Sequence, residues 1–190
     1  MNIVLASGSP RRRELLEMLK ISPLKIIPAT GEEHPAPGLG PEETVAALSR
    51  QKADEVAAKC APEDVIIAAD TIVWFDGEIL GKPKDHDDAV RMLSALSGNE
   101  HTVFTGVTVS RGAETSTEVE ASKVRFRALS AREIEAYIAT GEPMDKAGAY
   151  GAQGRAAVFV EGITGDFFNV MGLPLCRLGK MLAKLGVELI

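Results

Sequence analysis

The chain has 190 residues, of which 45% are hydrophobic and 25% are charged, the mixture of an ordinary globular protein. Its formal net charge of −6 argues against a nucleic-acid polymer as partner, since such partners favour a basic surface, but leaves room for a small phosphate ligand. Cys60 and Cys176 fit no metal spacing, the N-terminus has no leader pattern, and no apolar run approaches the ~20 residues that cross a bilayer. We therefore expect a reduced, cytoplasmic protein without membrane contact.

The first predicted elements are a strand, a tight turn and a helix. Residues 2–6 are apolar and partly β-branched, which is typical of a buried strand, and Ser7-Gly8 permits a sharp turn. Ser9 is a favourable N-cap and Pro10 a favourable first helical residue. Such a helix start gathers free backbone N–H groups, and Arg11–Arg13 in its first turn oppose the helix dipole unless an anion binds there. The stretch predicts a phosphate site, with ordinary capping and a solvated arginine face as the alternatives.

The rest of the chain alternates helices and strands. We expect strands at 24–27, 65–69 with an extended continuation at 72–75, 78–80, 101–111, 114–127 and 156–160, and helices at 10–20, 41–60, 85–97, 130–140 and 174–185. The long antiparallel pair around Arg111-Gly112 argues against a purely parallel sheet. The pattern predicts a single α/β domain over 1–190, with a central twisted mixed sheet, flanking helices, and a site at strand ends in a cleft between two lobes.

Asp70 is the most informative acidic residue. It follows five apolar residues at the end of the predicted strand 65–69, where ligands collect in open α/β sheets. A carboxylate in that position binds a metal, acts as a base, or caps the next turn, and all three roles stay open here. Phosphate chemistry with Mg²⁺ needs hard oxygen ligands and several cations, and the chain offers candidates in Glu33, Asp70, Lys52, Lys82 and Arg13.

Two further residues lie in restricted surroundings. Lys82 is bracketed by Gly81 and Pro83, which holds a lysine more firmly than a free chain does. Gln153 lies between glycines in the long loop 141–154, and its amide has the donor and acceptor that read a base edge; a surface amide is the alternative. The sequence has no Gly-x4-Gly-Lys-Ser/Thr, His-Glu-x2-His or Gly-x-Ser-x-Gly motif.

Several of these stretches, taken in order, resemble the Maf family of nucleoside triphosphate pyrophosphatases over essentially the whole chain. The matching stretches are 7–16, 69–71, 80–83, 96–98 with His101, 124–126, 141–150 and 170–174. The resemblance implies the cleft-bearing α/β fold of the inosine triphosphate pyrophosphatases. It also implies hydrolysis of a nucleoside triphosphate to the monophosphate and pyrophosphate with a divalent cation, Mg²⁺ or Mn²⁺. Members of the family remove non-standard or excess nucleotides, are linked to restraint of septum formation, and are often homodimers.

The resemblance also implies roles for individual residues. Asp70 matches the proton acceptor, with Glu33 and Asp70 as metal ligands. The subfamily that this chain resembles prefers dTTP and UTP. Arg12, Thr71 and Gln153 match the residues that set this base preference. Phosphates or metal are held by Ser7, Arg13, Glu33, Lys52 and Lys82, and Ser9 belongs to the same strand–turn–helix phosphate site. Ala152 stands where an isoleucine is more usual, which leaves the preference among pyrimidines open.

Two other functions are compatible with the same residues. A nucleotidyltransferase also opens with an apolar strand, a small-residue turn and arginine, and releases pyrophosphate, but it needs an acceptor substrate. A nucleotide-binding regulator of cell division binds a triphosphate without consuming it. Release of pyrophosphate without an acceptor separates the hydrolase from both.

Overall fold

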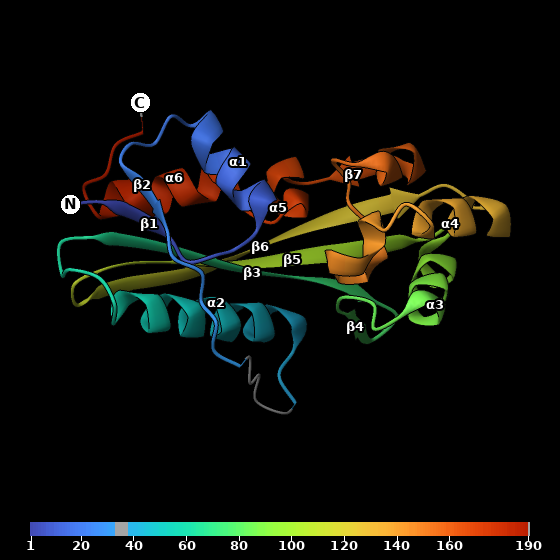
Figure 1. The fold of residues 1–190 in the computed structure, drawn as a ribbon, viewed down its shortest axis with the longest axis horizontal. Helices are drawn as coiled ribbons and strands as arrows, with labels where there is room; N and C mark the ends of the chain where they lie inside the picture. Colours follow the sequence, from blue (N-terminus) through green and yellow to red (C-terminus); the bar gives the residue numbers. More distant parts are fainter. Residues whose placement is uncertain (33–37, 190) are drawn as a thin grey trace. The chain divides into compact units, whose positions relative to one another are not determined.

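The computed structural model describes residues 1–32 and 38–189 and shows a mixed α/β fold (Figure 1). Its strands are β1 (Ile3–Leu5), β2 (Leu24–Ile26), β3 (Val65–Phe75), β4 (Glu78–Leu80), β5 (Glu100–Arg111), β6 (Glu114–Phe126) and β7 (Val160–Thr164). Its α-helices are α1 (Pro10–Met18), α2 (Pro41–Ala57), α3 (His86–Leu96), α4 (Ala131–Ile138), α5 (Phe167–Met171) and α6 (Leu175–Lys184). Short 3₁₀ helices occur at Glu142–Asp145, Ala147–Ala149 and Arg155–Phe159.

The strands form one mixed sheet, which confirms the predicted fold class. Their order is β2-β1-β3-β5-β6-β7, and β4 pairs with β3 outside this path. β1 runs parallel to β2 and β3, whereas the β3–β4 and β6–β7 pairs are antiparallel. The chain divides into two compact units: unit 1 contains Met1–Asp70, Thr105–Glu120 and Gly172–Ile190, and unit 2 contains Thr71–Phe104 and Ala121–Met171. The single domain with a cleft between two lobes stays a prediction.

In unit 1, helices cover both faces of the strands, with α2 on one face and α1 and α6 on the other (Figure 1). The α2 face buries Ala53 and Val56 in one cluster with Val4 of β1, Ala6 directly after that strand, and Ile66 and Ala68 of β3. Gly106 of β5 sets how closely α2 approaches, because a Cβ atom there would lie 2.2 Å from the carbonyl oxygen of Val45. The backbone of α2 therefore lies directly against β5.

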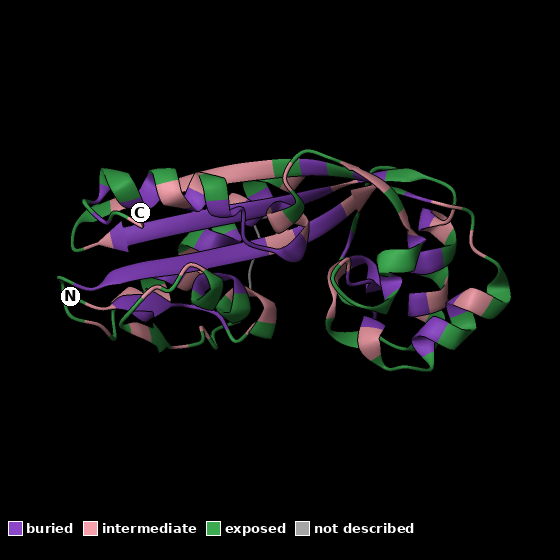
Figure 2. Cartoon of the chain, turned by 90° about the horizontal axis from the view of Figure 1, so that it is seen from above, coloured by how far each residue is buried: buried purple, intermediate pink, exposed green. Residues whose placement is uncertain are grey.

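In unit 2, the core is built around an aromatic cluster to which α3 and α4 add aliphatic side chains. Phe126 and Tyr150 make an edge contact with ring centroids 4.8 Å apart, and Tyr137 contacts Phe159 in the same way. His101 is 2% exposed, and its Nε2 lies 2.8 Å from the hydroxyl of Tyr150. Burial lowers the pKa of His101 to about 4, since the charged imidazolium loses its water there. Figure 2 shows how the buried residues line the strands and the inner helix faces.

The structure corrects the sequence prediction at two places. The strand predicted at 156–160 is wrong: Arg155–Phe159 is a 3₁₀ helix, and β7 follows it at Val160–Thr164. Ala156 and Phe159 are both buried, and their spacing of three residues places them on one face of a 3₁₀ turn.

The second correction concerns the strand that carries Asp70, which does not end at Ala69 but runs unbroken to Phe75. The reason is an exchange of partners. β1 pairs in parallel with residues 65–67, whereas β4 pairs in antiparallel with residues 73–75. Asp70 therefore lies inside β3, just beyond the end of its parallel ladder.

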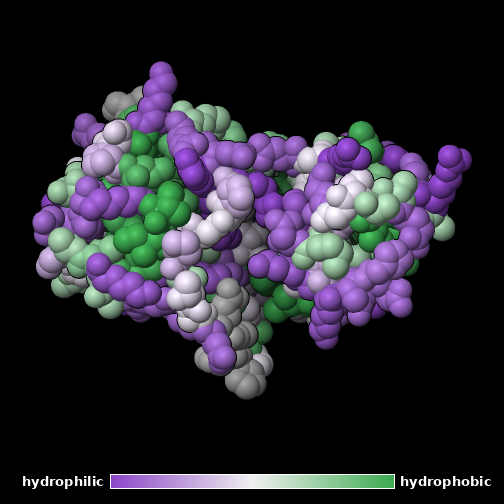
Figure 3. Space-filling model, in the orientation of Figure 1, coloured by the Kyte–Doolittle hydropathy of each residue, from purple (hydrophilic) through white to green (hydrophobic). Residues whose placement is uncertain are grey.

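Among the described residues, no helix has the length and apolar character needed to cross a membrane. Hydrophilic side chains cover much of the face drawn in Figure 3, with hydrophobic ones gathered in patches between them.

Candidate active site

The N-terminal strand–turn–helix forms as predicted and fixes one of its arginines. Ser7 follows β1 and is buried, and its hydroxyl oxygen accepts hydrogen bonds from the Ser9 backbone N–H and from Arg12 Nη1, both at 3.2 Å. The Nε of Arg12 donates to the carbonyl oxygen of Gly172 at 2.8 Å. The guanidinium of Arg12 is thus held from two sides before any ligand binds.

The neighbouring Arg13 is in a different environment. Its side chain is 61% exposed and forms an ion pair of 2.7 Å with Glu17, one helical turn further along α1. Hydrogen bonding to Glu17 raises the pKa of Arg13. An exposed pair of this kind contributes little to stability, so the guanidinium can exchange Glu17 for another anion at small cost.

Ser9 occupies the predicted N-cap position of α1, but its side chain makes no capping hydrogen bond. The first turn of α1 contains no acidic residue, and Pro10 lacks an N–H group. The backbone N–H groups that open a helix have no partner within the helix, and they carry its positive end. The start of α1 therefore keeps the donors and the field that suit an anion.

Lys52 and Asp70 form a partly buried ion pair. The Nζ of Lys52, on α2, lies 2.5 Å from Oδ1 of Asp70, on β3, and the two side chains are 17% and 10% exposed. The close contact of α2 with Gly106 supports this geometry, because it fixes the helix that carries Lys52. A carboxylate at the end of a parallel ladder, with an ammonium group beside it, is equipped to accept a proton close to bound phosphate oxygens.

Helix α2 also holds the segment that leads towards Glu33. The carboxylate of Glu55 accepts hydrogen bonds from the backbone N–H groups of Thr30 and Gly31, at 3.1 and 3.0 Å. Its hydrogen bond with Lys59 and these two backbone bonds lower the pKa of Glu55 to about 2. Gln51 Nε2 donates to the carbonyl oxygen of Glu32 at 2.7 Å. Glu33 itself, a predicted metal ligand, lies outside the described residues.

The described part of the chain contains no cluster of three or more histidine, cysteine or acidic side chains that would enclose a metal ion. Asp70 is the predicted ligand that lies within it. Mg²⁺ is commonly bound through one or two carboxylates, with water and substrate phosphates completing its shell. A single buried carboxylate beside an ammonium group, as Asp70 is beside Lys52, fits such a shared site.

The remaining predicted residues belong to unit 2. Thr71 follows Asp70 on β3 and is half-buried. Lys82 is exposed between Gly81 and the buried Pro83. The backbone N–H of Gly148 donates to the carbonyl oxygen of Gly81 at 3.0 Å, which ties the loop 141–154 to the start of the lysine segment. Gln153 is exposed in a turn of that loop.

Sequence reasoning missed the residues that position Arg12 and the turn that carries Gln153. Gly172 anchors Arg12 from 160 positions away, and no spacing rule reports such a contact. Tyr137 and Glu142 hold the turn that carries Gln153, because they accept hydrogen bonds from the backbone N–H groups at its two ends. The glycines at 151 and 154 indicate a turn in the sequence, but they do not indicate which residues hydrogen-bond to it.

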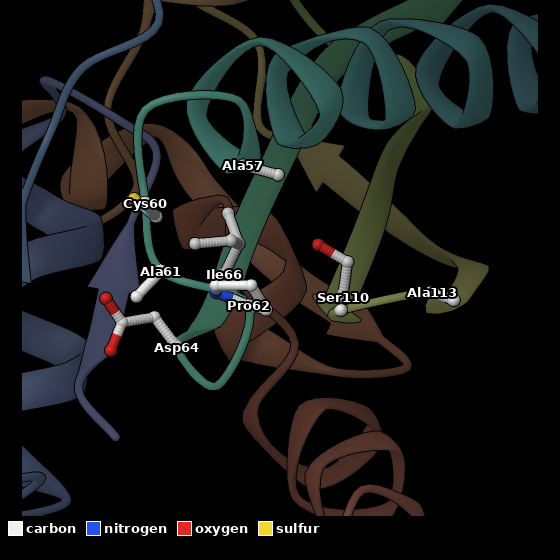
Figure 4. A pocket seen from close by; sticks show the side chains of 9 residues that line it. Ala57, Cys60, Ala61, Pro62, Asp64, Ile66, Ser110 and Ala113 are labelled. Atoms are coloured by element: carbon white, nitrogen blue, oxygen red, sulfur yellow. The ribbon is translucent and has the colours of Figure 1, made fainter.

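A pocket of about 370 Å³ lies in unit 1, near the start of β3 and distant along that strand from Asp70 (Figure 4). Cys60, Asp64, Ile66 and Ser110 are among the residues that line it. None of the predicted site residues that the structure describes is among those lining it, so we assign it no part in the proposed chemistry.

The fold and these groups together indicate a class of protein: an α/β enzyme that acts on a phosphate-containing substrate. The family follows from comparison with known proteins. The family model described as Maf-like protein matches residues 2–185, and the chain belongs to this family.

Curated relatives match along almost their whole length. The dTTP/UTP pyrophosphatase of Methanosarcina barkeri is 48% identical over 190 residues, which cover 98% of this chain and 95% of that protein. The dTTP/UTP pyrophosphatase of Syntrophomonas wolfei subsp. wolfei is 49% identical over 188 residues, with 98% of each chain covered. Among solved structures, a HAM1 protein from Coxiella burnetii shares the fold, with a TM-score of 0.52, 15% identity, and coverage of 97% of this chain and 99% of that one.

Proposed function

We propose that this chain hydrolyses nucleoside triphosphates, dTTP, UTP and modified pyrimidine nucleotides above all, to the nucleoside monophosphate and pyrophosphate. The substrate class follows from the relatives named dTTP/UTP pyrophosphatase, which are nearly half identical over almost the whole chain. The observation that carries the chemistry is the partly buried pair of Lys52 and Asp70 just beyond the parallel ladder of β3.

In the proposed reaction, Asp70 accepts a proton from the attacking water. The water oxygen forms a bond to the α-phosphorus, the bond from that phosphorus to the α–β bridging oxygen breaks, and pyrophosphate leaves with the bonding electrons. Negative charge grows on the leaving oxygens. Lys52, held 2.5 Å from Asp70, keeps a positive charge beside the carboxylate and the reacting phosphate.

The phosphate chain binds at the start of α1, with cationic side chains around it. The start of α1, with Ser7 and Ser9, offers hydroxyl groups and backbone N–H donors, and Arg13 is free to turn from Glu17 to a phosphate oxygen. Lys82 adds a cation from its bracketed loop. Base preference belongs to Arg12, Thr71 and Gln153, of which Arg12 has the most rigid support.

The reaction uses a divalent cation, Mg²⁺ or Mn²⁺, with Asp70 and Glu33 as the proposed protein ligands. When bound, such a cation withdraws charge from phosphate oxygens and makes the attacking water more acidic. The hard carboxylate oxygens suit these ions rather than softer ones.

The setting that we propose is nucleotide house-cleaning in the cytoplasm, by a homodimer that does not bind nucleic-acid polymers, with a link to restraint of septum formation. Light scattering after size-exclusion chromatography measures the molar mass in solution and so tests the homodimer. A variant that lacks activity but keeps its fold separates any effect on cell division from catalysis.

One assay tests the reaction against both alternatives. The purified chain is incubated with Mg²⁺ and single triphosphates, without an acceptor, and the products are identified by chromatography. The proposal expects monophosphate and pyrophosphate in equal amounts, with dTTP and UTP turned over faster than purine triphosphates. Turnover only after addition of an acceptor would indicate a nucleotidyltransferase, and tight binding without turnover a regulator.

A further inference from the structure

The turn that presents Gln153 is held at both ends. At its start, the backbone N–H of Gly151 donates to the hydroxyl oxygen of Tyr137 at 3.2 Å. At its end, the backbone N–H of Arg155 donates to both carboxylate oxygens of Glu142, at 3.0 and 3.1 Å. The side chain of Gln153 stays exposed between these two anchors.

The two anchors are themselves connected. The hydroxyl group of Tyr137 donates to Oε1 of Glu142 at 3.0 Å, so one carboxylate is linked to both ends of the turn. Tyr137 is 4% exposed, and its ring packs edge-on against Phe159 with centroids 5.2 Å apart. The hydroxyl group is therefore fixed by the aromatic core of unit 2.

The backbone of Glu142 is fixed as well. Lys146 Nζ donates to the Glu142 carbonyl oxygen at 2.7 Å and pairs with Asp145, also at 2.7 Å. The fit around these groups is tight. A Cβ atom at Gly154 would lie 2.1 Å from Glu142 Oε1, and one at Gly151 would lie 2.8 Å from Cε of Lys146. A side chain at either position would have to displace these anchoring groups, so glycine at 151 and 154 leaves room for them.

We propose that Glu142 is a positioning residue for base selection: its carboxylate, together with the Tyr137 hydroxyl, fixes the turn that presents the Gln153 amide to the nucleobase. This inference rests on the proposed function, in which Gln153 reads the base. Reading a base edge needs an amide held in one orientation, since a mobile amide satisfies many partners equally. The side chain of Gln153 is exposed, and the Glu142 network fixes the backbone turn from which it extends.

The test compares discrimination between dTTP and dATP, measured as the ratio of kcat/KM values, in a double-mutant cycle. Glu142→Ala is expected to lower the ratio by about tenfold, the usual effect of losing hydrogen bonds to a charged group, mainly through a higher KM for dTTP. Gln153→Ala is expected to lower it at least as much. Because Glu142 acts through Gln153, the double variant should discriminate no worse than Gln153→Ala alone.

Two further variants keep the test decisive. Glu161→Ala is the matched control, since Glu161 is an exposed glutamate of the same unit that pairs with Arg125 at the surface, and it should leave the ratio unchanged. Tyr137→Phe removes only the hydroxyl group, so it is expected to fold and to lower the ratio in the same direction even where Glu142→Ala does not fold.

The outcomes are distinguishable. Wild-type discrimination in both Glu142→Ala and Tyr137→Phe, with discrimination lost in Gln153→Ala, would overturn this inference and leave the proposed function standing. Additive losses in the double variant would also overturn it, because Glu142 would then act independently of Gln153. Unchanged discrimination in Gln153→Ala would remove the base-reading role of Gln153 on which this inference rests and would leave the proposed hydrolysis itself to the product assay.

Discussion

The Nζ of Lys52 and the Oδ1 of Asp70 lie 2.5 Å apart, although the residues come from a helix and a strand 18 positions apart in sequence. Both side chains are largely shielded from water. A shielded pair keeps its geometry better than a surface pair, because few competing partners reach it. This arrangement gives the proposed proton acceptor a fixed position and a neighbouring positive charge.

Replacement of Asp70 by asparagine tests that role. Asp70→Asn keeps the shape and one acceptor oxygen for Lys52 but removes the basic carboxylate. We expect kcat to fall by about 10² or more, the scale for loss of a general base, with little change in the melting temperature. Asp76→Asn, in the exposed turn between β3 and β4, is the matched control and should retain activity. Near-normal turnover by Asp70→Asn would exclude it as the proton acceptor.

Replacing each of the two neighbouring arginines by alanine should change a different kinetic property. Arg12 is braced by Ser7 and Gly172, so Arg12→Ala should reduce the preference for dTTP and UTP over purine triphosphates. Arg13 is exposed and paired only weakly, so Arg13→Ala should raise KM several-fold for every triphosphate alike and leave stability nearly unchanged. Steady-state kinetics on a set of triphosphates checks both. An unchanged base preference in Arg12→Ala would contradict the first assignment, and an unchanged KM in Arg13→Ala the second.

Gly106 links core packing to the active site. A Cβ atom there would lie 2.2 Å from the backbone carbonyl oxygen of Val45, and backbone yields less readily than a flexible side chain. We expect Gly106→Ala to lower the free energy of unfolding by about 2 kcal/mol and to reduce kcat as α2 shifts with Lys52. Gly179→Ala on α6, where the new methyl group meets only ordinary contact, is the control and should be neutral or stabilising. Chemical denaturation measures both, and equal stabilities would contradict the close packing.

The buried His101 makes stability depend on pH. Its pKa is about 4 in the folded chain against 6.5 in the unfolded chain, so between these values the unfolded chain binds the extra proton. The contribution of neutral His101 to the free energy of unfolding is fully present above pH ~6.5. It is lost as the pH falls towards ~4, a change of about 3 kcal/mol. His101→Gln removes the titrating ring, so the fall in stability over this range should become smaller by a similar amount.

His86 provides the contrasting control. Hydrogen bonds to Asp87 and Glu135 raise the pKa of this exposed histidine, so it favours the folded chain at low pH and loses that effect as the pH rises. His86→Gln should therefore steepen the loss of stability on acidification, whereas His101→Gln should flatten it. Urea unfolding from pH 4 to pH 7 measures both slopes, and identical slopes in wild type and His101→Gln would contradict the assignment.

The elements that the sequence predicts well are those with local signals. The capping box of Ser130 and Glu133 forms at the start of α4, and Pro10 begins α1. Asp70 was expected at a strand end, but β3 continues because β4 replaces β1 as its partner, and no local pattern encodes a change of partner. The strand expected at 156–160 failed for a related reason, since a short apolar run suits a 3₁₀ turn as well as a strand.

The site divides in the same way. The sequence indicates which lysine, aspartate and arginine residues are candidates for a phosphate site. Which arginine is held rigidly was not, because the contact that distinguishes Arg12 from Arg13 comes from Gly172 at the far end of the chain. Glu142 escaped notice since its direct contact with the turn goes to the backbone N–H of Arg155, a group that every residue but proline carries.

The central claim is that water attacks the α-phosphorus. Hydrolysis of dTTP in ¹⁸O-labelled water, followed by mass spectrometry of both products, tests it most directly. The account predicts one labelled oxygen in the thymidine monophosphate and none in the pyrophosphate. Label in the pyrophosphate, or release of orthophosphate in its place, would show that the attack occurs at another phosphorus and would contradict the mechanism.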